Sequence, residues 1–189
     1  HTHPHATLTG LDAETINHNT VEELLSKAAG ILIPGGFGNR GISGKIEAIR
    51  HARENQIPFL GICLGMQLSI IEFTKNVLKM KNSGSSEFGK HTNNVISLMT
   101  EWSKKNQKVK RTKENDLGAT MRLGSYPCYI KEKSLASKVY KKKLIHERHR
   151  HRYEVNPKYR SLIEKKGLVF SGFSKDKKLL EIIENKNHK

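Results

Sequence analysis

A cysteine and two glycines stand at the spacing with which many hydrolases expose a nucleophile. Gly61, Cys63 and Gly65 form a G-x-C-x-G pattern within the segment GICLGMQ. In hydrolases this pattern is typical of a tight turn between a strand and a helix, with the nucleophile at its tip. Glycines are needed on both sides because the backbone there leaves no room for Cβ atoms. The residue types therefore predict nucleophilic chemistry at Cys63, such as acyl transfer from an amide.

Two backbone N–H groups are expected to stabilise the oxyanion that forms on an attacked carbonyl. One belongs to Leu64, directly after the nucleophile. The other belongs to Gly36, in the earlier glycine-rich segment PGGFGNRG. The start of a helix at Leu64 is also expected to lower the pKa of the Cys63 thiol. Each motif alone could be an ordinary strand–helix connection, with Cys63 as a structural thiol, but their occurrence together favours catalysis.

The elements that must position these turns alternate between apolar runs and helical patterns. Residues 30–34 and 58–62 are short apolar runs that predict buried strands. Residues 21–27, 42–54 and 64–73 carry patterns that predict helices. The alternation predicts an α/β fold with a doubly wound, mostly parallel sheet and helices on both faces. Ligands of such sheets bind at the carboxyl ends of the strands, where both glycine turns lie.

The second half of the chain gives weaker signals. Residues 79–94 are polar, and we expect a loop there that carries Glu87. The remaining predicted elements are strands at residues 95–99, 126–131 and 168–170, a helix at residues 157–166, and turns at residues 116–119 and 124–125. Cys128, on one of these strands, is interpreted as a packing residue.

Seven segments of the sequence resemble the glutamine amidotransferase domain of the CTP synthase family, which is a class I glutaminase. In chain order they are ILIPGGFGNRG, IPFLGICLGMQ, SSEFGKH, TEW, DLGATMRLG, ERHRHRYEVNP and LLEIIE. RHRHRYEVN and TMRLG resemble this family rather than glutaminases in general. The resemblance implies a flavodoxin-like fold of the class I glutamine amidotransferases. It also implies glutamine hydrolysis that supplies ammonia for the ATP-dependent amination of UTP to CTP.

The resemblance further implies roles for individual residues. Cys63 would form a glutamyl thioester, and the N–H groups of Gly36 and Leu64 would form the oxyanion hole. A zwitterionic substrate needs one anion and one bidentate cation placed apart, roles that Glu87 and Arg152 would fill for the α-amino and α-carboxylate groups. The implied glutamine-binding residues are Gly36, Leu64, Gly65, Met66, Gln67, Glu87 and Arg152. No metal site is implied in these residues. ATP, Mg²⁺ and UTP would bind a synthetase domain that these residues do not contain.

The sequence departs from the family pattern at both ends. The family places a catalytic histidine and glutamate in a QFHPE-type motif after the segment that matches LLEIIE, and this sequence holds no such motif. His146, His149 and His151 match the RHRHR segment, and we interpret them as strand or pocket-wall residues and not as a substitute base. Residues 1–10 match nothing in the family. We therefore expect residues 11–189 to be a partial glutaminase domain, incomplete at both ends and with little activity alone.

Composition and charge narrow the classes of protein to which this chain can belong. No apolar run in the 189 residues approaches the length of a membrane span. The only cysteines, Cys63 and Cys128, make neither a disulfide framework nor a zinc site, which favours a cytoplasmic protein. The net charge of +16 lies in residues 81–189, because residues 1–80 hold seven basic and seven acidic side chains. The lysine clusters lack the interleaved aromatic residues of a nucleic-acid platform, so a solvated surface is favoured.

Three functions stay open, and the first is favoured. They are the glutaminase domain of a CTP synthase, another class I glutaminase or γ-glutamyl hydrolase-like enzyme, and a catalytically silent basic binding module. The expected partners are L-glutamine, the synthetase domain of the same enzyme and further copies of the chain in the complete enzyme. A membrane or nucleic-acid partner is not expected.

Overall fold

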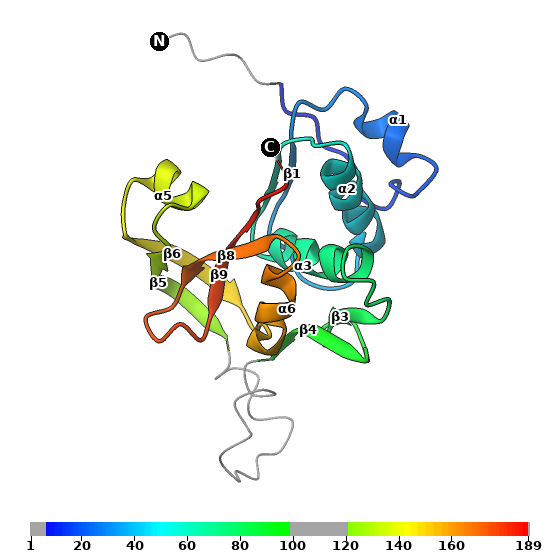
Figure 1. Ribbon diagram of the computed structural model, residues 1–189. Coiled ribbons are helices and arrows are strands. Elements are labelled where there is room, and N and C mark those ends of the chain that lie inside the picture. Colours follow the sequence, from blue (N-terminus) through cyan, green and yellow to red (C-terminus); the bar gives the residue numbers. More distant parts are fainter. Residues whose placement is uncertain (1–6, 99–120, 189) are drawn as a thin grey trace, which may run out of the picture.

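The structure is a computed structural model that describes residues 7–98 and 121–188. In the first half, shown in blue to green in Figure 1, helices alternate with short strands. These elements are α1 (Val21–Leu25), β1 (Ile31–Ile33), α2 (Ile42–Glu54), β2 (Phe59–Gly61), α3 (Leu64–Asn76), β3 (Ser83–Ser85) and β4 (Asn93–Leu98). The second half consists of β5 (Arg122–Ile130), α5 (Leu135–Tyr140), β6 (Leu144–His151), β7 (Tyr153–Val155), a 3-10 turn η2 (Pro157–Tyr159), α6 (Arg160–Glu164), β8 (Leu168–Phe173) and β9 (Leu180–Asn185).

The strands form three sheets, and parallel strand pairs occur only in the first half of the chain. β1 pairs with β2 and β3 with β4 in parallel, whereas β7 joins β4 antiparallel. The third sheet has the order β6-β5-β8-β9 and is antiparallel throughout. The α/β class is as predicted, but a mostly parallel sheet is not found in the second half. The short turn between β8 and β9 cannot hold the crossover that parallel strands require.

Most predicted elements are present, with two corrections. Helix α2 covers the predicted residues 42–54, and β1, β2, β4, β5 and β8 lie on predicted strands. The predicted turn at Gly124 and Ser125 is wrong, because both residues lie inside β5, which pairs with β6 without a break. The predicted loop at residues 79–94 contains strand β3. The predicted turn at residues 116–119 and the TEW segment lie outside the described residues.

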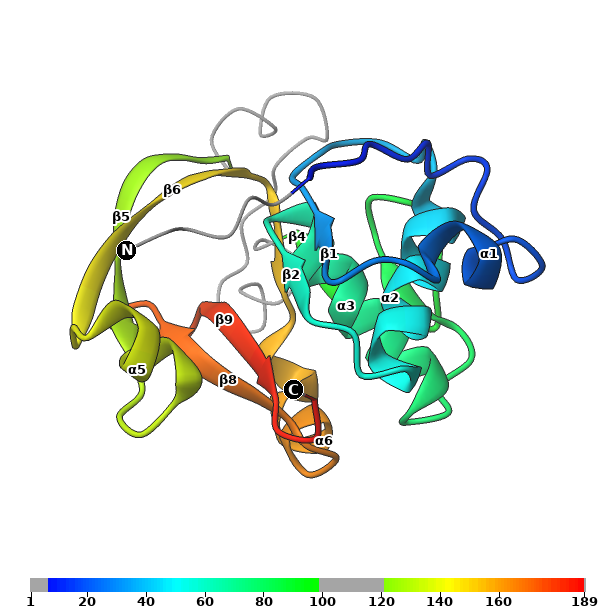
Figure 2. The ribbon, with the colours of Figure 1, turned by 90° about the horizontal axis from the view of Figure 1, so that it is seen from above.

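Two apolar cores hold these layers together. The larger one surrounds α3, whose side chains are buried on nearly every face, and extends to β4, α6 and β8. The smaller one lies under α5 and contains Cys128, Ile130, Ala136 and Ile145, so Cys128 is a packing residue as predicted. Figure 2 shows α3, α2 and then α1 on one side of β1 and β2, with the antiparallel sheet and α5 on the other side. None of the described helices has the length and apolar character that crossing a membrane requires.

A buried ion pair fixes helix α2 against helix α3. The Arg53 guanidinium donates to both carboxylate oxygens of Glu72, at 2.8 to 3.0 Å. The Glu72 side chain is 1% exposed, so its negative charge depends on this partner. Arg53 also donates to Glu54 at 3.0 Å, but the Glu54 side chain is 44% exposed and well solvated. The same guanidinium therefore makes one buried and one solvated ion pair.

This difference in burial predicts unequal effects of two glutamate substitutions. Glu72→Ala removes the buried partner of the Arg53 guanidinium, which is 21% exposed and keeps Glu54, and should lower the free energy of unfolding by about 1–3 kcal/mol. Glu54→Ala removes a solvated partner of the same guanidinium and should cost less than about 1 kcal/mol. Urea unfolding followed by circular dichroism measures both. Equal losses in the two variants would contradict the assignment of Arg53–Glu72 as the stabilising pair.

Candidate active site

Cys63 lies at a strained turn between β2 and α3. Its backbone has φ 54° and ψ −105°, and α3 begins with the next residue. A positive φ is unusual for a residue with a side chain and is maintained only where the surrounding structure enforces it. The N–H of Ile62 donates to the carbonyl of Ile33 at 2.9 Å, which ties the turn to the end of β1. The predicted strand–turn–helix around the nucleophile is therefore present.

The two flanking glycines are required by close backbone contacts. A Cβ atom on Gly61 would lie 2.6 Å from the carbonyl carbon of Gly65. A Cβ atom on Gly65 would collide with the carbonyl oxygen of Ile33 in β1. Side chains at these positions would separate the first turn of α3 from the strands. Gly65 thus has a packing role, in addition to its predicted place in the glutamine pocket.

The second glycine turn, between β1 and α2, packs directly on the nucleophile. A Cβ atom on Gly35 would lie 3.4 Å from the Cβ of Cys63, and one on Gly36 would lie 3.3 Å from Leu64 Cδ2. The backbone N–H groups of Leu64 and Gly36 lie near the Cys63 sulfur and lower the pKa of its thiol. The structure therefore brings together the thiol and both N–H groups predicted for the oxyanion hole.

The pKa of the Cys63 thiol is raised, contrary to the sequence-based expectation. Burial is the largest cause, because it disfavours the thiolate. The N–H groups of Leu64 and Gly36 lower the pKa, whereas the negative charges of Glu154 and Glu87 raise it further. The helix N-terminus acts in the expected direction but is outweighed by burial. The thiol is consequently in its protonated form in the free site at neutral pH.

Glu87 lies beside the glycine-rich turn and near the thiol. Its carboxylate accepts a hydrogen bond from the N–H of Gly38 at 3.2 Å. The side chain is partly buried, and burial raises the pKa of its carboxyl while the Gly38 N–H lowers it. Within residues 7–98 and 121–188, no side chain forms an ion pair with Glu87. A carboxylate with this environment can accept an ammonium group from a ligand.

Arg152 stands between β6 and β7, next to a strand that is attached to the nucleophile helix. The Gln67 side chain donates from Nε2 to the carbonyl of Tyr153 at 2.8 Å, which joins α3 to β7. The Arg152 Nε atom is buried and has no hydrogen-bond partner among the described residues. A buried guanidinium donor without a partner is suited to receive a carboxylate.

The other predicted pocket residues have clear places but different contributions. The side chain of Leu64 is in the larger core, so only its backbone can face a ligand. Met66 is partly buried and packs against the same core. Gln67 is buried, and its amide is bonded to β7, so it holds the pocket wall.

A group of five buried ionisable residues, which we call the buried charge ring, was not predicted as a unit. It consists of Arg122, His149, His151, Glu154 and Glu181. Arg122 donates to Glu154 at 3.1 Å and to Glu181 at 2.9 Å. His149 Nδ1 and His151 Nε2 share a hydrogen bond of 2.9 Å. The only signal in the sequence is the alternation of charged residues and histidines along β6.

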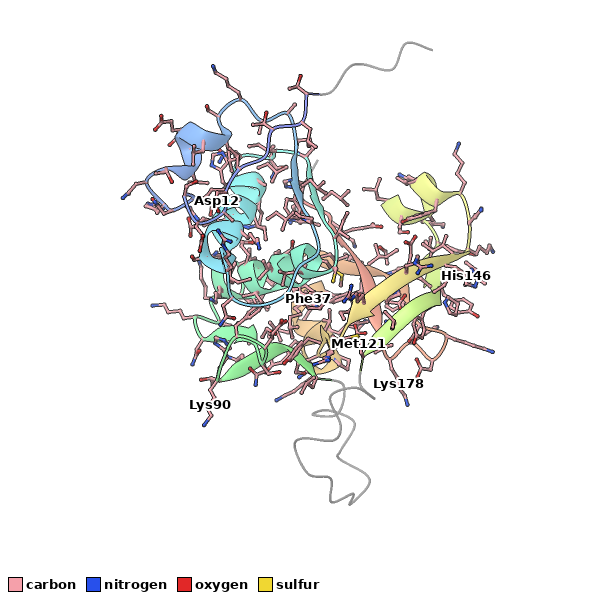
Figure 3. All side chains as sticks on the ribbon, turned by 180° about the vertical axis from the view of Figure 1, so that it is seen from behind. Asp12, Phe37, Lys90, Met121, His146 and Lys178 are labelled. Carbon is pink, nitrogen blue, oxygen red and sulfur yellow. The ribbon has the colours of Figure 1, made fainter. Side chains whose placement is uncertain are left out.

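The three histidines of β6 have different environments. His149 and His151 point to the buried face, and their side chains are 11% and 14% exposed. His146 is exposed and lies on the outer part of the sheet, away from Phe37 at the glycine turn (Figure 3). Burial lowers the pKa of His149 and lowers the pKa of His151 to about 4. All three are strand residues, as interpreted from the sequence.

Comparisons with known proteins show the family to which this chain belongs. The family model for glutamine amidotransferase class-I matches residues 5–189. CTP synthase from Pelagibacter ubique is 57% identical over 181 residues, which is 96% of this chain and 34% of that protein. CTP synthase from Caldanaerobacter subterraneus is 54% identical over 94% of this chain and 32% of that protein. The chain thus spans about a third of the length of the curated relatives it matches.

A solved structure supports the same assignment. The glutaminase domain of Trypanosoma brucei CTPS with bound acivicin superposes with a TM-score of 0.83 at 35% identity. The superposition covers 96% of this chain and 68% of that one. The strained Cys63 turn, the adjacent glycine turn and these comparisons agree. The chain belongs to the class I glutamine amidotransferase family, as a glutaminase domain of the CTP synthase type.

Proposed function

We propose that this chain hydrolyses the side-chain amide of L-glutamine through a thioester on Cys63. In the complete protein the released ammonia would pass to a synthetase domain that aminates UTP to CTP. ATP, Mg²⁺ and UTP would bind to that domain, which would also form the contacts between subunits of a homo-oligomer in the cytoplasm. The observation that carries the proposal is the convergence of the Leu64 and Gly36 N–H groups on the sulfur of a strained nucleophile turn.

The chemistry follows from the placement of these groups. The Cys63 thiolate attacks the amide carbon of glutamine, and the carbonyl oxygen becomes an oxyanion beside the sulfur. The N–H groups of Leu64 and Gly36 then stabilise that oxyanion, because they already point to this position. When the tetrahedral intermediate collapses, the C–N bond breaks, the leaving nitrogen takes up the proton that the thiol gave up, and ammonia is released; water then hydrolyses the resulting glutamyl thioester to glutamate and restores the thiol.

Glu87 and Arg152 are proposed to select an amino acid as substrate. The Glu87 carboxylate would bind the α-ammonium group, and the Arg152 guanidinium would bind the α-carboxylate. Each group gains an opposite charge that no described residue supplies, so both are stabilised when the substrate binds. A substrate that lacks either charge would leave one of them unpaired.

No general base for Cys63 is identified among the described residues. The groups that lower the pKa of its thiol are backbone N–H groups. A thiol with a raised pKa and no adjacent imidazole forms little thiolate at neutral pH. We therefore propose that the chain alone hydrolyses glutamine slowly.

The first prediction concerns this slow activity. Ammonia release from glutamine should be low and should disappear in Cys63→Ala. The reason is that, among the described residues, Cys63 is the proposed nucleophile at this turn and no other side chain there can replace it. A Cys128→Ala variant is the matched control, since Cys128 is buried in the smaller core and should leave the rate unchanged. Cys63-independent release would contradict the nucleophile assignment. Faster turnover of γ-glutamyl peptides than of glutamine would favour the γ-glutamyl hydrolase-like alternative.

The second prediction concerns substrate binding and needs no turnover. In a Cys63→Ala background, Arg152→Ala should weaken glutamine binding by about tenfold or more, because a charge-assisted hydrogen bond is lost. Arg148→Ala is the control, since Arg148 is exposed on the outer face of β6. Isothermal titration calorimetry measures both affinities. An equal loss in the two variants would indicate a general effect of positive charge and not a contact with the carboxylate.

The third prediction concerns the complete protein that contains this domain. Cys63→Ala should abolish CTP formation with glutamine as nitrogen donor and preserve CTP formation with free ammonia. The reason is that only the first route requires a thioester at Cys63. CTP formation is followed by its absorbance change with each donor in turn. Surviving glutamine-dependent synthesis would remove Cys63 from the mechanism.

A further inference from the structure

The buried charge ring includes a residue of β7, the strand bonded to the nucleophile helix, and carries more negative than positive charge. The side chains of Arg122, Glu154 and Glu181 are 7%, 6% and 3% exposed. With neutral imidazoles, a single guanidinium faces two carboxyl groups, which leaves one negative charge in excess. An uncompensated buried charge is costly, so the ring favours uptake of one proton.

The two imidazoles connect the carboxyl groups and limit where this proton can reside. His151 Nδ1 is 3.3 Å from Glu154 Oε1, and His149 Nε2 is 3.9 Å from Glu181 Oε2. Between them, His151 Nε2 and His149 Nδ1 share one hydrogen bond. The order of contacts around the ring is therefore Glu154, His151, His149, Glu181 and Arg122.

The geometry allows a proton on Glu154. A neutral imidazole carries one N–H. With Glu154 protonated, its O–H faces His151 Nδ1, the His151 Nε2–H donates to His149 Nδ1, and the His149 Nε2–H faces Glu181, so no lone pair is turned toward that carboxylate. Only the contact between the two imidazoles is a hydrogen bond, because His151 Nδ1, His149 Nε2 and Glu181 Oε2 have no hydrogen-bond partner among the described residues.

The electrostatics agree with this geometry. Burial raises the pKa of Glu154 to about 7, although Arg122 lowers it. Burial and the neighbouring His149 lower the pKa of His151, so this imidazole is neutral when Glu154 gains or loses its proton. The groups that face Glu154 are Arg122 from β5, His151 from β6 and Glu181 from β9.

Strand β7 connects the ring to the nucleophile turn. Glu154 follows Tyr153, whose carbonyl accepts the Gln67 amide from the first turns of α3. Its charge acts on the Cys63 thiol, together with that of Glu87 from the loop after β3. A proton on Glu154 therefore removes one of the two negative charges that oppose the thiolate.

We propose that Glu154, by gaining or losing the proton of the buried charge ring, controls the ionisation of the Cys63 thiol. Glu154 is thus a positioning residue, which acts on the reaction through Cys63. This inference rests on the proposed function only for the reaction that Glu154 would affect, which is glutamine hydrolysis. A falling pH neutralises Glu154 and makes the thiolate easier to form, whereas a rising pH restores the opposing charge.

Alkylation of Cys63 tests the proposal without requiring glutamine. The rate of reaction with iodoacetamide follows the thiolate fraction, and mass spectrometry of the Cys63 peptide excludes Cys128. Glu154→Gln removes the titrating charge and keeps the shape of the side chain. Its rate should equal that of the wild type below about pH 6 and exceed it several-fold above about pH 8. Glu87 is present in both proteins, so its effect on the pKa of Cys63 cancels in the ratio of their alkylation rates.

Glu181→Gln is the matched control. It removes a carboxylate that is equally buried and bound to the same Arg122, but Glu181 is not among the main groups that raise the pKa of Cys63, whereas Glu154 is. Its alkylation rate should not increase above about pH 8. Equal increases in the two variants, or no pH dependence of the Glu154→Gln ratio, would overturn the proposal.

The wild-type profile supplies a second measurement if either variant fails to fold. A thiol beside a titrating carboxylate should gain less than tenfold in rate per pH unit between about pH 6 and pH 8. A full tenfold gain per unit across that range would also overturn the proposal. Failure of glutamine hydrolysis leaves both alkylation experiments interpretable, so the two proposals are tested separately.

Discussion

The site depends on the close packing of the first turn of α3 against the ends of β1 and β2. Gly65 approaches the Ile33 carbonyl so closely that no side chain fits between them, and Gly61 approaches Gly65 in the same way. This contact forces Cys63 into a positive φ and places the Leu64 N–H at its sulfur. The Gly36 N–H reaches the sulfur because the preceding strand, β1, ends at the same contact. The buried α3 core and the Arg53–Glu72 pair supply the rigidity that such a strained residue requires.

The same packing that exposes the nucleophile geometrically also makes it harder to ionise. Close contact excludes water, and loss of hydration disfavours a thiolate more than two N–H groups favour it. Burial does not act alone, since Glu87 and Glu154 both oppose the negative charge. In the proposed function Glu87 binds the substrate ammonium group, and its opposition to the thiolate would then be a consequence of substrate selection. A bound substrate ammonium would neutralise that charge and make thiolate formation easier at the moment when a carbonyl is present.

The sequence predicted the nucleophile turn and the first half of the fold because both depend on local signals. Gly61, Gly65 and the apolar runs before them have fixed spacing, and helix α2 was bounded correctly from its pattern alone. The second half was predicted less well because its strands do not alternate between apolar and polar residues. After Ile145, the inward positions of β6 are Glu147, His149 and His151, so a buried face looked like a solvated one. Gly124 predicted a turn, whereas its φ of 108° lies within a continuous strand pair.

The buried charge ring explains why those inward positions can be polar at all. Residues from β5, β6, β7 and β9 meet there, and the segment from His149 to Glu154 is far in sequence from both Arg122 and Glu181, so no local pattern could reveal the group. An apolar cluster would hold the strands equally well, since buried ion pairs seldom improve stability over apolar packing. What a charged ring adds is a dissociable proton next to the nucleophile. The polar residues of β6 are therefore better explained by electrostatic control of Cys63 than by stability of the sheet.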